Sequence, residues 1–304
     1  MGKPLDARGV GASLVMVLLF SGMTVARKLT LPALSPLGGL GVTLVVGSAV
    51  LAAVAAVAGQ SLRPRGGLGL LLLNGCWYTA FTACFQLGVA QTGAGWSNSL
   101  QMAFPLFTLA TSAFVLRTER PGLGRLLGMA VAMGGLLLLG SARSQEAAPT
   151  ANALVIVSPV LLGTQICFVR ALASRFGALP TIAWQQGVAG GLCLLGVSFS
   201  GFWAGPDGPS GLTPAAWAAL AYMAFAAHAA AFWLQATLLA RYTASDVSAF
   251  FLASPFLGVL AAWVALGEPL DPALLGSACV MAVGIGLVFQ GDRLFALLAR
   301  SWSR

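Results

Sequence analysis

Long apolar runs separated by short polar breaks dominate the chain. Ten windows of roughly twenty apolar residues can be marked, and this is the length that a helix needs to cross a hydrocarbon core about 30 Å thick. They span residues 9–28, 36–58, 66–88, 92–115, 122–141, 152–171, 180–203, 214–239, 245–266 and 272–290. Each run is continuous, whereas the strands of a transmembrane barrel alternate in polarity over about ten residues. The pattern predicts an all-α integral membrane protein with ten transmembrane helices.

Composition and charge agree with this class and add a topology. Hydrophobic residues make up 58% of the chain and charged residues only 8%, against roughly 25% charged in a soluble globular protein. If the N-terminus is placed inside, thirteen of the 16 basic residues fall at inner helix ends. The positive-inside rule therefore predicts cytoplasmic termini, in a multi-pass protein that we expect in a bacterial cytoplasmic (inner) membrane. The net charge of +8 then reflects topology, so no nucleic-acid partner is expected.

One unusual helix pattern occurs twice. The runs "FPLFTLATSAFVLRTERP" (104–121) and "SPFLGVLAAWVALGEP" (254–269) each place a proline, Pro105 or Pro255, inside an apolar stretch. Each also ends with an acid before a second proline, at Glu119 and Glu268. The alignment extends over five spans per copy, and because five is odd, the second copy is inverted. We therefore expect a first repeat over 9–141, a linker over 142–151, a second repeat over 152–291 and an interfacial cytoplasmic tail over 292–304.

The opening residues also fit a signal peptide, with a basic head, an apolar run and small residues near Ala26. Cleavage there would leave nine spans and would spoil the pairing of the two repeats. The interpretation with ten spans is therefore preferred.

Inverted repeats are typical of secondary transporters, in which one half moves against the other around a site near the membrane midplane. Enzyme motifs such as the phosphate-binding GxxxxGK[ST] loop or HExxH are absent from the sequence. The five cysteines fall inside spans without the spacing of a zinc or redox site. We therefore expect a carrier that is not an enzyme and that has no cofactor and no metal.

Polar and aromatic residues recur at helical spacing inside several spans, and such intramembrane polar residues are the functional candidates. The candidate substrate-binding residues are Asn74, Tyr78, Phe81 and Phe85 in span three, Asn98 and Gln101 in span four, Gln165 in span six, Trp184 and Gln185 in span seven, and His228, Phe232 and Gln235 in span eight. Each could instead form a helix–helix hydrogen bond worth roughly 1 kcal/mol or less. Three stripes at similar depth favour a central cavity that binds substrate by hydrogen bonds and stacking.

Several of these positions allow two interpretations. His228 could bind a proton or a carboxylate, or it could be a structural histidine. Arg27 and Lys28, at the outer end of span one, could attract an anionic group or reach towards the lipid headgroups. Pro105 and Pro255 each remove a helical hydrogen bond, which provides either matched hinges or static kinks. Glu119 and Glu268 are expected to cap the amides of the next helix.

The chain resembles the EamA-type members of the drug/metabolite transporter superfamily. The likeness is carried by the two five-span halves, by "VRALASRFGALPTIAWQQGVAGG" in spans six and seven, and by "ASPFLGVLAAWVALGEPLDPALLGSACVMAVGIGLV" in spans nine and ten. Two motifs depart from the family pattern, because "RTERP" lacks the glycine before its acid and "FSGMTVARK" lacks a tryptophan.

The resemblance implies a monomeric or homodimeric carrier that exports amino acids or related zwitterions. Alternatives of the same class are carriers of nucleobases, nucleotide sugars, metallophores or drug-like cations. Alternatives of another class are an integral membrane lipid enzyme and a sensor.

Overall fold

The structure is a computed structural model that describes residues 5–62, 66–89, 101, 103–141, 149–201, 203–254, 257, 276, 279–288 and 290. Over these residues the chain forms helices joined by turns, with one isolated antiparallel bridge between Leu34 and Ala204. Six helical segments are long and apolar enough to cross a membrane: Ala7–Arg27, Pro36–Val57, Leu68–Gly88, Pro149–Phe176, Ala178–Ser200 and Pro214–Arg241. Shorter apolar helices occupy the other four predicted windows, so the all-helical class is confirmed and the count of ten spans stays a prediction.

The elements follow the two predicted halves. In the first half they are α1 (Ala7–Ser21), α2 (Met23–Thr30), α3 (Pro36–Val57), α4 (Leu68–Val89), α6 (Phe104–Ala110), the π-helix η1 (Thr111–Val115) and α7 (Leu123–Ser141). In the second half they are α8 (Pro149–Phe176), α9 (Ala178–Ser200), the 3-10 helix η2 (Gly208–Gly211), α10 (Pro214–Ala221), the π-helix η3 (Tyr222–Ala231), α11 (Phe232–Arg241), α12 (Ala244–Ala249) and the 3-10 helix η4 (Phe250–Ala253).

Residues with capping side chains begin several of these helices. Asp6 accepts a hydrogen bond from Gly9 N at 2.8 Å at the start of α1, and Ser35 accepts one from Gly38 N at 3.1 Å at the start of α3. Thr213 does the same for Ala216 N at 3.2 Å before α10. These bonds satisfy amides that the first helical turn leaves without a partner. The prolines that begin α3 and α10 remove no helical hydrogen bond, because an N–H in the first turn has no partner within the helix.

Three predicted spans are less regular than the sequence suggests. Span one breaks at Gly22 between α1 and α2. Span eight passes through the π-helix η3 between two α-helical parts. A new helix, α6, begins at Phe104, which places Pro105 in its first turn, where a missing N–H is tolerated. A hinge at Pro105 stays a prediction, and Pro255 lies outside the described residues.

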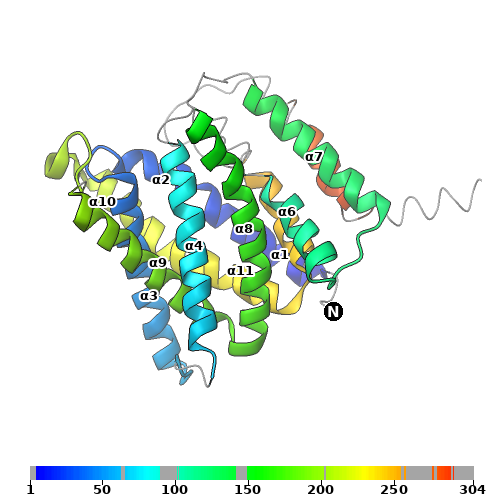
Figure 1. Cartoon of the computed structure of the whole chain (residues 1–304), viewed down its shortest axis with the longest axis horizontal. Helices are drawn as coiled ribbons and strands as arrows, with labels where there is room; N and C mark the ends of the chain where they lie inside the picture. The colour runs from blue at the N-terminus through cyan, green and yellow to red at the C-terminus, as the bar shows by residue number, and fades with distance from the viewer. Residues whose placement is uncertain are drawn as a thin grey trace, which may run out of the picture.

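The helices pack mainly across the boundary between the two halves. Helix α3 packs on α9, α4 packs on α8 and α9, and α1 packs on η3 and α11. Figure 1 shows α4 and α8 side by side, with α3 and α9 beside them. The main core therefore lies in the seam between the halves, where Met16, Leu44, Tyr78, Ile182 and Phe232 belong to one buried cluster.

The fifth helix of each half also pairs with its counterpart. In Figure 1, α7 lies at the edge of the molecule beside the segment Cys279–Val288. A Cβ on Gly128 would lie 2.5 Å from Val288 N, and one on Gly284 would lie 2.3 Å from Ala132 N. Span two thus pairs with span seven, and span five pairs with span ten.

The contact between α8 and α6 depends on a glycine, which gives a testable prediction. A Cβ on Gly163 would lie 2.6 Å from Phe107 Cβ and 2.7 Å from Thr108 N, so a larger residue would push the two helices apart. Gly163→Leu should lower the free energy of unfolding by about 1 to 3 kcal/mol. The loss is measured as a lower melting temperature of the purified protein in detergent.

Gly191→Leu is the matched control, because a Cβ on Gly191 in α9 would meet no atom within 4 Å. Equal melting temperatures of the two variants would contradict the packing described for α6 and α8.

Candidate functional site

A buried amide cluster lies in the seam between the halves. Asn74 of α4 donates from Nδ2 to Gln185 Oε1 of α9 at 3.0 Å, and Gln165 Nε2 of α8 donates to the same oxygen at 2.7 Å. All three side chains are at most 1% exposed. The predicted residues of spans three, six and seven are therefore brought together at one point.

Two further polar contacts extend this seam. Ser158 Oγ of α8 donates to Gln101 Oε1, which joins span six to span four. Gln186 Nε2 of α9 donates to the backbone carbonyl of His228 in η3. Gly47 of α3 makes room for this contact, since a Cβ there would lie 2.8 Å from Gln186 Oε1 and 2.9 Å from His228 Cβ. All these groups are buried.

Aromatic rings fill the space beside the amide cluster. Tyr78 packs against Phe81 at a centroid distance of 5.6 Å and edge-on against Phe232 at 5.7 Å. Phe81 in turn stacks on Phe85 at 6.3 Å, and Phe232 meets Phe20 at 4.8 Å. The rings pack along the seam, and the edge-to-face contacts of Phe232 with Tyr78 and Phe20 are of the kind that aromatic pairs prefer.

Several polar atoms of the seam have no hydrogen-bond partner among the described residues. They are Asn74 Oδ1, Gln101 Nε2, Gln185 Nε2, Gln186 Oε1 and both ring nitrogens of His228. A buried polar atom without a partner costs about 1 to 3 kcal/mol. The seam thus holds more donors and acceptors than helix packing alone uses.

The remaining predicted residues are placed less centrally. Trp184 donates its indole N–H to the carbonyl of Leu62, in the loop after α3, at 2.8 Å. Gln235 is buried in α11, 4% exposed, one turn beyond Phe232. Asn98 lies outside the described residues.

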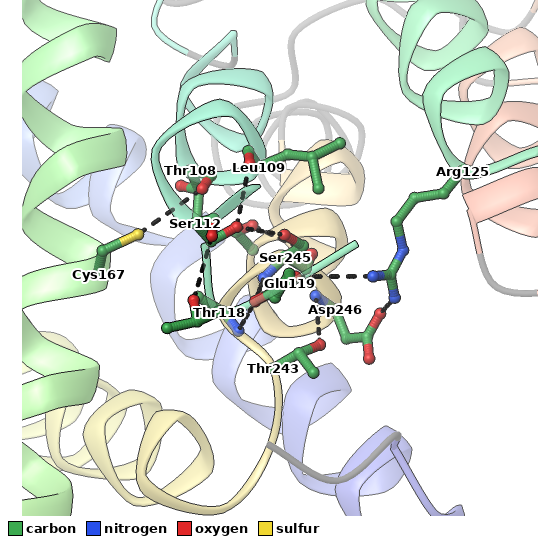
Figure 2. A network of polar contacts seen from close by, with 12 residues as sticks. Thr108, Leu109, Ser112, Thr118, Glu119, Arg125, Cys167, Thr243, Ser245 and Asp246 are labelled. Atoms are coloured by element: carbon green, nitrogen blue, oxygen red, sulfur yellow. Dashed lines mark hydrogen bonds and ion pairs between the residues drawn. The ribbon is translucent and has the colours of Figure 1, made fainter. Parts of the chain in front are cut away.

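Sequence reasoning missed a cluster of charges that joins the halves (Figure 2). Glu119, which follows η1, accepts from Ala244 N at 2.9 Å and Ser245 N at 3.4 Å through Oε1. Arg170 of α8 reaches the same oxygen at 3.4 Å, and Arg125 of α7 lies 3.6 Å from Oε2. We call these residues, together with Asp246 that also pairs with Arg125, the Glu119 cluster.

The expectation that Glu119 caps the next helix is therefore wrong. The next helix is α7, but the carboxylate caps α12 of the other half. The amides of Thr118 and Glu119 both donate to the carbonyl of Ser112, and this folds the chain back after η1 and directs the carboxylate inwards. The matching expectation for Glu268 falls on a residue outside the described part of the chain.

A second contact closes the same end of the molecule. Tyr242, which follows α11, donates its hydroxyl to Asp6 Oδ1 at 2.8 Å and so joins the start of α1 to the second half. The backbone N–H of Gly9 and this hydroxyl both favour the charged carboxylate, so they hold the pKa of Asp6 below its usual value. We refer to this end as the Asp6 end.

The opposite end contains a small pocket between α2, α3 and η3. Its lining includes Arg27, Thr30, Ser35, Thr43 and His228. Its volume of about 10 Å³ is room for roughly one water molecule. We refer to this end as the Arg27 end.

Comparisons with known proteins give the class. The EamA-like transporter family model matches residues 7–141 and 149–290, which is most of the chain in two copies. The chain therefore belongs to the EamA-like transporter family, a family of membrane transporters of the drug/metabolite type. A comparison with curated proteins found no significant match.

Solved structures support the same fold. One crystal structure, described only as that of a protein, superposes with a TM-score of 0.81 at 19% sequence identity. The match covers 96% of this chain and 99% of the other. At this identity the likeness shows the fold alone.

Removing the charge of Glu119 tests the Glu119 cluster. Glu119→Ala leaves Arg125 and Arg170 without this partner and removes the acceptor of Ala244 N and Ser245 N. The N-cap Thr243 of α12 still accepts from Asp246 N. The free energy of unfolding should therefore fall by about 2 to 4 kcal/mol. Glu119→Gln keeps an acceptor for Ala244 N and should lose less. Melting temperatures in detergent report both, with the exposed Arg120→Gln as control. Equal melting temperatures for Glu119→Ala and wild type would contradict the cluster.

The contact between Asp6 and Tyr242 predicts a pH dependence. Because the pKa of Asp6 is lowered in the folded protein, its stabilising effect is complete above the unfolded pKa and is lost as the pH falls through the folded one. Asp6→Asn should therefore melt below wild type at pH 7, and the gap should shrink below about pH 4. A gap that stays constant down to pH 3 would contradict this assignment.

Proposed function

We propose that this protein is a secondary transporter that exports small metabolites such as amino acids or related zwitterions. The two halves would move against each other, so that a site in the seam faces each side of the membrane in turn. The proposal includes the inverted arrangement of the two repeats and the cytoplasmic position of both termini.

The observation that carries the proposal is the set of unpartnered polar atoms in the seam. A lipid-embedded bundle gains little from buried amides that keep spare donors and acceptors, so such groups mark substrate pathways. Gln101 Nε2 and Gln185 Nε2 supply donors, whereas Asn74 Oδ1 and Gln186 Oε1 supply acceptors. A zwitterion carries both kinds of group and matches this mixture. The rings of Tyr78, Phe81 and Phe232 would cover its apolar part.

The Glu119 cluster supports an alternating mechanism. It ties η1, α7 and α8 to the start of α12 at the Asp6 end, which the positive-inside rule places in the cytoplasm. The bonds of Glu119 to α12 cross between the halves, and they would separate when that side opens. Ion pairs near a membrane surface suit this role, because water can hydrate the separated charges. Pro105 lies in the first turn of α6, four residues after the seam residue Gln101, and would serve as a hinge for the movement of the two halves.

The test is counterflow into proteoliposomes that contain the purified protein, with a panel of amino acids, nucleobases and organic cations. Saturable uptake of an amino acid, driven by the same compound inside the vesicles, is the expected result. Uptake of a nucleobase or an organic cation instead would favour the other substrate classes. The absence of uptake for the whole panel would contradict the proposal.

Gln101→Leu tests the place of the site. The change removes an amide whose hydrogen bond to a described residue is the one from Ser158, so the fold should persist while uptake falls at least about tenfold. Ser198→Ala, an exposed polar change on α9, is the matched control and should keep wild-type uptake. Wild-type uptake by Gln101→Leu would remove this residue from the site.

A further inference from the structure

The pocket at the Arg27 end contains a cation that forms no ion pair with a described residue. Arg27 lies at the end of the first apolar span, partly buried, and its one hydrogen bond to a described side chain is to Gln86 Oε1 at 3.5 Å. No ion pair of Arg27 is found within the described part of the chain. A guanidinium has five N–H donors, so a single long bond to a neutral amide leaves most of them available.

A second unpartnered group faces the same pocket from η3. His228 is 1% exposed, and neither ring nitrogen has a hydrogen-bond partner among the described residues. The ring is nevertheless held in place, because it stacks on the Phe232 ring with a centroid distance of 5.7 Å and an interplanar angle of 16°. In addition, the backbone carbonyl of His228 accepts a hydrogen bond from Gln186. It also lies in a π-helix, an irregularity that is frequent at functional sites. The imidazole is thus fixed in position and left free to bond.

The pocket favours a negative ligand. None of its lining residues is acidic, and Arg27 and His228 are the lining residues that bring N–H donors to it. The hydroxyls of Thr30 and Thr43 donate to backbone carbonyls of their own helices. Arginine binds carboxylates through two parallel hydrogen bonds, and such charge-assisted bonds are about twice as strong as neutral ones. The pocket has room for about one water molecule, so a carboxylate would enter only when the lining side chains move apart.

We propose that Arg27 and His228 form the binding subsite for the carboxylate of the transported molecule. This inference rests on the proposed function and narrows its substrates to molecules with a carboxylate. The apolar part of the molecule would extend from His228 along Phe232 to Tyr78 and Phe20, whose rings lie in continuous contact. Nucleobases and organic cations have no group that would neutralise Arg27.

Binding to the full-length protein in detergent tests the subsite with three probes. These are L-phenylalanine, L-phenylalaninamide, which lacks the carboxylate, and 3-phenylpropanoate, which keeps it and lacks the amine. The acid should bind at least about tenfold more tightly than its amide, because the amide cannot form the charge-assisted pair. The phenylpropanoate should compete with the acid. Titration calorimetry measures all three.

Variants then assign the effect to residues. Arg27→Gln should reduce the preference for acid over amide to about onefold, and Arg27→Lys should keep part of it, since lysine keeps the charge but not the forked geometry. His228→Gln should weaken the acid more than the amide. Arg8→Gln, an exposed change at the other end of α1, is the control and should keep the wild-type preference.

Each outcome decides the inference. The inference is overturned if the wild-type protein binds L-phenylalanine and its amide equally, or if it binds neither acid probe. These two outcomes need no variant, so the test holds even if Arg27→Gln fails to fold. An unchanged preference in a folded Arg27→Gln also overturns it. Carboxylate-selective binding without uptake in proteoliposomes would leave the subsite standing and count against the proposed function instead.

Discussion

The constraint on which the rest of this structure depends is that lipid offers no hydrogen bonds. Each polar group inside the bundle must find a partner in the protein, or in something that the protein binds. Most of the chain meets this constraint simply, because hydroxyls such as those of Thr43 and Thr82 donate back to carbonyls of their own helices. The seam between the halves does not. There, amides from α4, α8 and α9 satisfy one another only in part.

The two ends of the molecule treat charge in opposite ways. At the Asp6 end, Glu119, Arg125, Arg170 and Asp246 compensate one another and hold the halves together. At the Arg27 end, a guanidinium and an imidazole face a small pocket without an acid in its lining. One end is therefore held together by internal ion pairs, while the charge of Arg27 at the other end has no ion pair to a described residue.

Much of the fold was predictable, because length and hydropathy are local properties. The bounds of α3, α4, α7 and α9 fall within about three residues of the predicted windows. The amide cluster was predictable as a set, since helical phase put Asn74 and Gln185 among the candidates.

The Glu119 cluster was not predictable, because its partners come from helices far apart in sequence and the direction of the carboxylate depends on the turn after η1. The role of Trp184 was missed for a similar reason. Its partner is a backbone carbonyl in a loop, and no side-chain pattern reveals such an acceptor.

The π-helix around His228 affects how the two α-helical parts of span eight are oriented relative to each other. Hydrogen bonds in a π-helix reach one residue further than in an α-helix, so η3 holds one residue more than regular winding would need. The side chains of α10 and α11 therefore do not follow one continuous α-helical periodicity. Loss of one residue from this segment would restore regular winding and turn α10 by about 100° relative to α11. The length of span eight, as much as its composition, thus sets how the side chains of α10 face relative to those of α11.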